Sequence, residues 1–498
     1  MNHEVDFSDV QGLVRFGYSA LTEASFLMLR IRDAAAASGW LASAPVANAV
    51  DAGKAPATAL HIAFTRQGLE ALGLPPQIIS GFSDEFLSGI WGEENRSHRL
   101  GDIASNAPEH WRWGGPEKIP HLVVMVYAQP GQLLSFSEKI KGPAWESAFE
   151  TIAVLPTSDL QGVEPFGFTD GISQPTLDWQ RGRSAADQLE YTNISCLGEF
   201  LLGYPNEYGR YTDRPLLPAD SNNALLPEAE DAPGMRDLGR NGTYLVFRQL
   251  QQDVRGFWQF VDQQSNGDPQ GREQLAWSMV GRTRKGDPLE ALNEQPIPGV
   301  ARTATPSNQF TYDADASGTR CPFGAHIRRA NPRNADFPAG TGGLISQLIH
   351  NLGFTKLGVR DDIMSSTRFH RLLRRGREYG PGLSPEQALQ PNYPDQEEHG
   401  IQFICLNANI SRQFEFVQGA WIMSTKFNGM SGESDPLLGN RQPIPGCPAT
   451  DNFLLPQPQG VARRVQGLPQ FVTVRGGAYF FLPGIRAIKF LTQVASHR

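Results

Sequence analysis

The stretch TYLVFRQLQQDVRGFWQFV, Thr243–Val261, decides the fold class. Its first five residues, Thr243–Phe247, are rich in β-branched and aromatic side chains and predict a buried strand. The apolar residues that follow are spaced as on one face of an amphipathic helix: Val254, Phe257, Trp258 and Val261. A strand that leads directly into a helix predicts a fold that combines sheets and helices.

The same order of elements appears in the first half of the chain. Leu60–Phe64, LHIAF, alternates apolar and other residues with strand period. The segment TRQGLEALGLPP that follows predicts a helix closed by Gly73 and Pro75. His121–Tyr127 reads as another buried strand, and further strands are expected at Phe403–Leu406 and Ala478–Leu482.

A tract rich in Pro, Asp and Asn, residues 204–240, separates these two halves. A chain of 498 residues is long enough for two or three packed units. We therefore predict two α+β domains, residues 1–220 and 221–498, each a sheet with helices on one face.

Composition excludes several classes of protein. The net charge of -8 argues against a nucleic-acid partner, because phosphate contacts need clustered Lys and Arg. The four cysteines are scattered without a CxxC pair, which indicates neither a zinc site nor a disulfide scaffold. The sequence has no signal peptide and no apolar run long enough to span a membrane, so a cytoplasmic protein without a membrane partner is expected.

The first candidate site is the stretch FGFTDGISQP, Phe166–Pro175, which places Asp170 among apolar residues. A carboxylate near apolar neighbours costs free energy unless it is paired or used in chemistry. Asp-Gly is also a common turn dipeptide, so a simple turn is the alternative.

The second candidate is CPFGAHIRRANPRN, Cys321–Asn334, which contains His326 and Arg333. A neutral imidazole is a good iron ligand, and a guanidinium suits a carboxylate such as a haem propionate. The alternatives are an ordinary packed or surface histidine and a solvated basic turn before Pro332.

The third candidate is RFHRLLRRGREYG, Arg368–Gly380. Taken alone, it also reads as a helix that ends at Gly376, with cations that complement the helix dipole.

Together the three stretches resemble the dye-decolourising peroxidase family. The GxxDG motif is present at Gly167–Gly171, the proximal-histidine segment as AHIRRANPR, and the distal-arginine segment as LLRRG followed by YG. The closing strands FICLNANISRQFEFVQ and GGAYFFLPG extend the resemblance, which runs from about Val10 to about Gly484. It implies two ferredoxin-like domains, antiparallel sheets with helices packed on them, and a haem pocket mainly in the second.

The resemblance assigns a role to each motif. His326 matches the axial haem ligand, Asp170 the distal acid–base residue, and Arg374 the distal arginine that stabilises charge. Further cofactor contacts are implied for Gly171, Ile172, Ser173, Asn331, Pro332, Arg333, Arg374, Ile401 and Phe403.

The implied function is a peroxidase with one haem b per chain. It would reduce hydrogen peroxide and oxidise dyes, phenolic or other bulky aromatic donors by one-electron steps through a ferryl intermediate. A carboxylate base has a lower reference pKa than histidine, so we expect activity biased toward acidic pH. A homo-oligomer is left open.

Two assignments stay open in the sequence. Between His326 and Arg374 lie 47 residues, including GTGG at 340–343, so Arg371 and Arg375 compete with Arg374 for the distal role. Glu415 is a candidate partner for the proximal imidazole, with an ordinary exposed strand residue as the alternative.

Two other functions were weighed against the peroxidase. A haem-binding or haem-handling protein of the deferrochelatase kind would need His326 and Arg333 but neither Asp170 nor Arg374. A hydrolase could use Cys321 or Ser173, but the chain has no GxSxG elbow and no Cys/His family signature. The presence of both distal residues favours the peroxidase.

Overall fold

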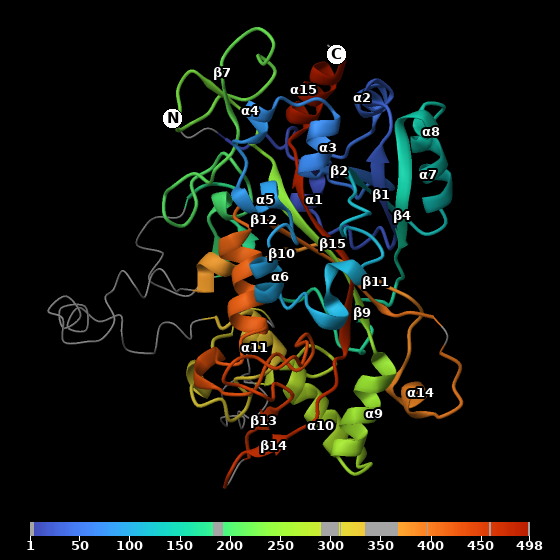
Figure 1. Ribbon diagram of the computed structural model, residues 1–498, viewed down its shortest axis with the longest axis vertical. Helices are drawn as coiled ribbons and strands as arrows, with labels where there is room; N and C mark the ends of the chain where they lie inside the picture. Colours follow the sequence, from blue (N-terminus) through green and yellow to red (C-terminus); the bar gives the residue numbers. More distant parts are fainter. Residues whose placement is uncertain are drawn as a thin grey trace, which may run out of the picture.

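A single nine-stranded antiparallel sheet forms the centre of the molecule (Figure 1). The computed structural model describes residues 4–182, 193–289, 308, 310–333, 367–395, 397–457 and 460–496. The strand order is β10-β12-β9-β15-β2-β3-β1-β4, and β11 also pairs with β12. The strands are β1 (Glu23–Ile31), β2 (Thr58–Phe64), β3 (Leu122–Ala128), β4 (Phe149–Pro156), β9 (Thr243–Gln252), β10 (Leu373–Arg374), β11 (Arg377–Tyr379), β12 (Gly400–Asn407) and β15 (Val472–Leu482).

The sheet consists of two halves joined edge to edge. Strands β1 to β4 pair with one another over long registers, and so do β9, β12 and β15. The halves meet at β15 and β2, where one residue pair, Phe481 and Phe64, is in register. This is the α+β class predicted from the sequence, with two ferredoxin-like halves.

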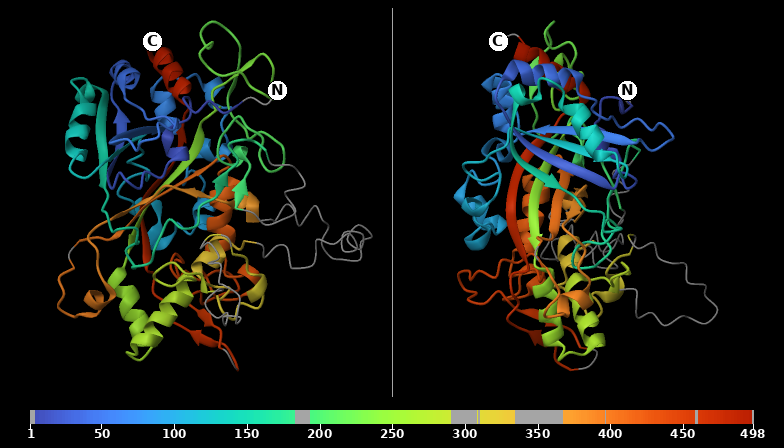
Figure 2. Two further views of the ribbon diagram at one scale, coloured as in Figure 1. Left: turned by 180° about the vertical axis from the view of Figure 1, so that it is seen from behind. Right: turned by 90° about the vertical axis from the view of Figure 1, so that its right-hand side faces the viewer.

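Most helices cover one face of the sheet, where their buried side chains share one core with it, and one short helix and loops cover the other face (Figure 2). They are α1 (Gly12–Arg15), α2 (Ala34–Ser43), α3 (Arg66–Ala71), α4 (Pro76–Ile79), α5 (Asp84–Ser88), α6 (Glu94–Leu100), α7 (Leu133–Lys141), α8 (Trp145–Ala148), α9 (Val254–Gln264), α10 (Pro269–Val280), α11 (His326–Ala330), α14 (Pro385–Leu389) and α15 (Ile485–Ser496). The α9–α10 pair lies at the end of the molecule opposite to the chain termini (Figure 1). None of the described helices has both the length and the apolarity that a membrane crossing requires.

The strongest patterns in the sequence were read correctly. The run Thr243–Phe247 begins β9, and the amphipathic stretch after it forms α9. The side chain of Asp253 begins this helix by accepting a hydrogen bond from the amide of Gly256. The other predicted strands lie in β2, β3, β12 and β15.

Two local interpretations were wrong. The stretch before Gly376 is not a helix, because Thr367–His370 forms one 3₁₀ turn and β10 then pairs with β12. The end of the expected strand FICLNANISRQFEFVQ is helical, with wide turns at Ser411–Glu415 and Val417–Ile422.

The tract between the halves contains a small hairpin of β7 (Leu216–Pro218) and β8 (Met235–Asp237). The remaining short pairs are β5 (Thr176–Leu177) with β6 (Ile194–Ser195) and β13 (Phe453–Leu455) with β14 (Arg463–Val465). The domain boundary at residue 220 stays a prediction. The GTGG segment at 340–343 lies outside the described residues.

Candidate active site

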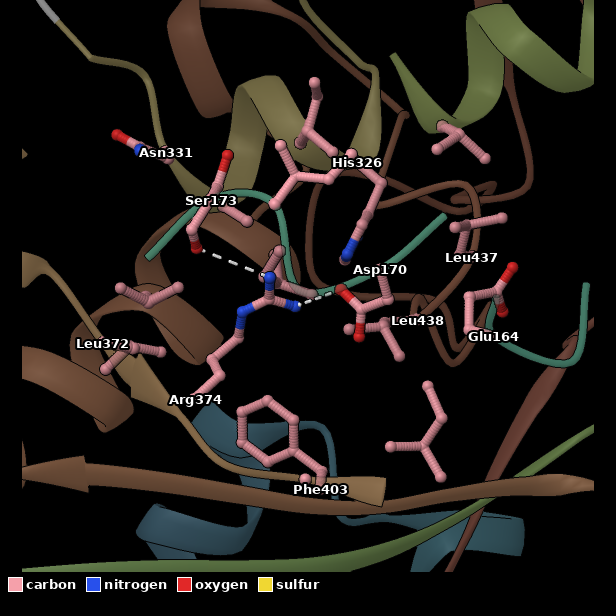
Figure 3. A pocket seen from close by; sticks show the side chains of 18 of the residues that line it. Glu164, Asp170, Ser173, His326, Asn331, Leu372, Arg374, Phe403, Leu437 and Leu438 are labelled. Atoms are coloured by element: carbon pink, nitrogen blue, oxygen red, sulfur yellow. Dashed lines mark hydrogen bonds and ion pairs between the residues drawn. The ribbon is translucent and has the colours of Figure 1, made fainter. Parts of the chain in front are cut away.

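A cavity of about 280 Å³ brings the three candidate stretches together (Figure 3). Its walls come from the loop after β4, from α11, from the 367–376 segment and from β12. Apolar side chains form much of the lining and include Leu372, Phe403, Leu437 and Leu438. Most of the walls belong to the second half of the chain, and the loop after β4 is contributed by the first half.

His326 is the first residue of α11 and points into this cavity (Figure 3). Its Nδ1 lies 2.9 Å from Oδ2 of Asp435. Asp435 is fully buried, and its Oδ1 accepts the amides of Leu437 and Leu438 at 2.9 and 2.8 Å. Because an ionised carboxylate only accepts hydrogen bonds, Nδ1 carries the proton and Nε2 is the nitrogen available to the cavity.

The His326–Asp435 pair shifts both pKa values. Burial acts to lower the pKa of His326, but the charge of Asp435 and its hydrogen bond together outweigh burial, and the pKa is raised. Burial acts to raise the pKa of Asp435, but His326 and the amide of Leu438 outweigh it and the pKa is lowered. The carboxylate therefore remains ionised and fixes the orientation of the imidazole ring.

Asp170 and Arg374 form an ion pair in the same cavity (Figure 3). Nη1 of Arg374 donates to Oδ1 of Asp170 at 2.9 Å. Gln174 holds the backbone of Arg374, whose amide donates to the Gln174 side chain at 3.0 Å. The side chains of Asp170 and Arg374 are 34% and 32% exposed, and both line the cavity.

The pKa of Asp170 is lowered although the residue is enclosed. Burial alone would raise it, but the charge of Arg374 and the amide of Gly171 outweigh burial. Gly171 has a φ of 77°, a backbone conformation that residues with a side chain rarely adopt. The site thus holds an ionised carboxylate that can accept a proton.

The other predicted residues divide into two groups. Those that line the cavity are Ile172, Ser173, Asn331, Arg333, Ile401 and Phe403. Gly171 and Pro332 do not belong to the lining, although each adjoins a residue that does.

The geometry distinguishes the three competing arginines. Arg375 points away from the cavity and donates to the carbonyl oxygens of Leu13 and Val14 at 2.7 and 2.9 Å. Arg371 lines the cavity, but its Nη1 donates to the carbonyl of Ile194 and the hydroxyl of Ser195. Of the three, Arg374 is the one that pairs with Asp170.

One edge of the cavity carries two buried guanidinium groups that meet at one hydroxyl. Arg282 and Arg333 donate to Oγ of Ser173 at 3.0 and 3.3 Å. Burial and the charge of Arg333 lower the pKa of Arg282 to about 10, and no carboxylate pairs with Arg282 among the described residues. Two adjacent cations of this kind favour an anionic group between them.

Asp435 and Arg282 were missed in the sequence, and Glu415 was given the wrong interpretation. Glu415 is neither the partner of His326 nor an exposed strand residue. It is buried, pairs with Nε of Arg96 at 2.8 Å and accepts the Tyr479 hydroxyl at 2.9 Å. The sequence signal for Asp435 is its place as an acidic residue in the stretch GESDPLLGN, and an acidic residue in such a stretch is a weak indication of a contact with a histidine.

The residues present fit a haem group. His326 offers a nitrogen for iron, the apolar walls suit a porphyrin ring, and the Arg282–Arg333 edge suits its carboxylates. Within the described ranges, no cluster of three or more His, Cys, Asp or Glu residues could hold a bare metal ion. A metal at His326 would therefore need other ligands, which a porphyrin supplies.

Comparison with known proteins gives the same answer. No family model matches the sequence. The chain is 26% identical over 514 residues to the dye-decolorizing peroxidase msp1 of Mycetinis scorodonius, covering 98% of this chain and 88% of that protein. The crystal structure of a fungal DyP-type peroxidase from Auricularia auricula-judae is 25% identical, with a TM-score of 0.71 over 99% of this chain and 100% of that one. A dye-decolorizing peroxidase solved in complex with 2,6-dimethoxyphenol shares the fold, with 23% identity and a TM-score of 0.71 over 98% of this chain and 100% of that one.

The two-half α+β fold and the cavity with its histidine, carboxylate and arginines define a haem enzyme of the peroxidase class. Along nearly its whole length the chain is similar to dye-decolorizing peroxidases, the family that its three motifs indicated.

Proposed function

We propose that this chain is a peroxidase with one haem b per chain, which reduces hydrogen peroxide and oxidises dyes, phenolic or other bulky aromatic donors one electron at a time. The relatives support this substrate class, since they are named for dye decolorization and one was solved with 2,6-dimethoxyphenol. The observation that carries the proposal is that one cavity is lined both by His326, whose Nε2 is available, and by the Asp170–Arg374 ion pair.

His326 would hold the haem iron, while Arg282 and Arg333 would bind the haem carboxylates. When bound, haem would supply the iron that accepts peroxide and the oxidising equivalents that the donors consume. Asp435 keeps the proton on Nδ1 of His326, which fixes the ring and makes Nε2 the more electron-rich donor.

Asp170 would move the proton that peroxide brings with it. As an ionised carboxylate it can take a proton from the oxygen nearer the iron and return it to the oxygen that leaves as water. Arg374 keeps Asp170 ionised and places a fixed positive charge where negative charge develops as the O–O bond breaks.

The haem-handling alternative is weaker. Such a protein would need His326 and Arg333, but an ion pair of Asp170 with Arg374 would have no role in it. A cytoplasmic location, the absence of nucleic-acid and membrane partners and a homo-oligomer stay predictions of the sequence.

Stopped-flow absorbance of the haem-loaded protein mixed with hydrogen peroxide tests the proposal. We expect a rapid change of the Soret band in the wild type and a slowing of roughly 10²-fold or more in Asp170→Ala and Arg374→Ala. Arg375→Lys is the matched control, since Arg375 points away from the cavity, and it should react at the wild-type rate. Slow bleaching of the haem in the wild type would instead favour the haem-handling protein.

A further inference from the structure

A second carboxyl group, Glu164, lines the same cavity as Asp170 and has no part in the mechanism above (Figure 3). It lies on the same loop after β4, where Val163 and Thr169 form an isolated bridge on either side of the turn. The cavity therefore contains two carboxyl groups, and their surroundings differ.

Only neutral groups donate to Glu164. Its Oε1 accepts the amide of Phe168 at 3.0 Å, and its Oε2 accepts the amide of Phe166 at 3.0 Å and Nε2 of Gln252 at 2.7 Å. No cation pairs with Glu164 among the described residues, whereas Asp170 is paired with Arg374.

The other charged groups nearby leave Glu164 without a counter-ion. Arg284 donates to the carbonyl of Gly167 at 3.4 Å, but its charge is paired with Glu273 at 3.5 Å. Glu378 of β11 adds a further acid that interacts with Asp170, and Arg374 and His326 interact with Asp170 as well.

Two carboxylates that face one cavity are not both ionised without cost, so their pKa values separate. Burial and the charge of Asp170 raise the pKa of Glu164, the hydrogen bonds from Gln252, Phe166 and Phe168 offset part of the rise, and the resulting pKa is about 7. The pKa of Asp170 is lowered. At neutral pH the cavity thus combines an ionised Asp170 with a Glu164 that can hold a proton.

We propose that Glu164 is a second proton-carrying residue of this site, which holds a proton in the cavity and exchanges it with Asp170 through water. The inference rests on the proposed peroxidase function. Hydrogen peroxide needs two electrons and two protons to become two water molecules, and each phenolic donor releases one electron and one proton. Asp170 moves a proton already on peroxide. Glu164 takes up the proton that each of the two donors releases and passes it on, one at a time, so that both protons reach the second water.

Infrared difference spectroscopy of the haem-loaded protein tests the protonation directly. The wild type should show the carbonyl stretch of a protonated carboxyl group that titrates near pH 7, and Glu164→Gln should lack it. Glu433→Gln is the matched control, because Glu433 is buried, its pKa is also raised to about 7, and it does not line the cavity. That variant should lose its own signal and keep the signal of Glu164.

Kinetics then separate a proton-carrying role from a structural one. The glutamine in Glu164→Gln keeps the shape of the side chain and one oxygen that accepts a backbone amide, but its NH2 group cannot accept the second amide, and it cannot ionise. We expect turnover with a phenolic donor below pH 7 to fall roughly 10-fold in this variant, with an unchanged rate of the first reaction with peroxide. In Glu433→Gln the pH profile should match that of the wild type.

The outcomes are distinguishable. A wild type that does not react with peroxide refutes the peroxidase function itself. A normal wild type with unchanged turnover in Glu164→Gln, or with no titrating carboxyl signal from Glu164, refutes this inference alone. If Glu164→Gln does not fold, Glu164→Asp keeps an ionisable group, and its carboxyl signal should titrate at a shifted pH; an unshifted signal would exclude Glu164 as its source.

Discussion

Nδ1 of His326 lies 2.9 Å from the carboxylate of Asp435, a residue 109 positions later in the chain. The carboxylate is buried and ionised, so the imidazole donates to it with one nitrogen and presents the other to the cavity. The electronic character of the proposed iron ligand is therefore determined by a residue outside the histidine motif.

Asp435→Asn should make the bound haem iron easier to reduce. The amide removes the negative charge that makes Nε2 electron-rich, so the reduction potential should rise, and haem affinity should fall by roughly 10- to 100-fold. Spectroelectrochemistry and haem transfer to a competing apoprotein measure the two effects. Glu415→Gln should leave the potential unchanged, because Glu415 does not contact His326.

Glu415→Gln should instead lower stability. Glu415 and Arg96 are both almost completely buried and pair at 2.8 Å, so the variant leaves a buried guanidinium with weaker compensation. We expect the free energy of unfolding to fall by about 3 kcal/mol. Denaturant titration would show the loss, and an unchanged midpoint would mean that Glu93 and Ser88 compensate for the lost charge.

The acid limb of the pH profile should depend on Arg374. Activity that needs ionised Asp170 is present above the pKa of Asp170 and is lost as the pH falls through it. Arg374 lowers this pKa, so in Arg374→Ala burial dominates and the limb should move to higher pH by about 1 unit or more. Residual kcat/KM for peroxide, measured against pH, checks this; a limb that does not move would indicate that another group controls the acid side.

His61, which does not line the cavity, should lower the stability of the fold at acidic pH. It is fully buried among Tyr18 and Tyr127, has no hydrogen-bond partner within the part of the chain that the structure describes, and burial lowers its pKa to about 3. The unfolded chain binds a proton below the ordinary histidine pKa and the folded chain does not, so stability falls as the pH drops below about 6.5. His61→Phe should remove roughly 2 kcal/mol of this loss at pH 5, measured by denaturant titration at pH 7 and pH 5. An equal loss of stability between pH 7 and pH 5 in the wild type and in His61→Phe would contradict a role for His61.

Patterns within single segments predicted the fold class well. The strand and helix of Thr243–Val261 were evident because packing on one face imposes a period on the sequence. The helix interpretation of the stretch before Gly376 was wrong, because its glycine and cations suit a helix end as well as a strand. The pairing of β10 with β12 decides between helix and strand. FEFVQ was expected to end a strand because the segment FICLNANISRQFEFVQ resembles a closing strand of the family. The helical turns there direct Phe414 toward Tyr479, and Phe416 stacks on His370.

The site was predictable where residues sit in a motif and not where they reach it from elsewhere. His326, Asp170 and Arg374 each lie in a recognisable segment, and the fold brings them to one cavity. Arg282 lines that cavity and Asp435 pairs with His326, and both come from segments with no distinctive local pattern. Their contacts arise from long-range packing, which a single sequence does not encode as a period or a spacing.

The meeting of β15 with β2 has a consequence for how the protein is made. Strand β15 is the last strand in chain order, yet it lies between β9 and β2 in the middle of the sheet, and Val472 at its start lines the cavity. The first half can fold while synthesis continues, since β1 to β4 pair among themselves. The half that carries the cavity cannot complete its sheet or close its pocket until β15 emerges from the ribosome, so we expect haem capture to follow the synthesis of β15.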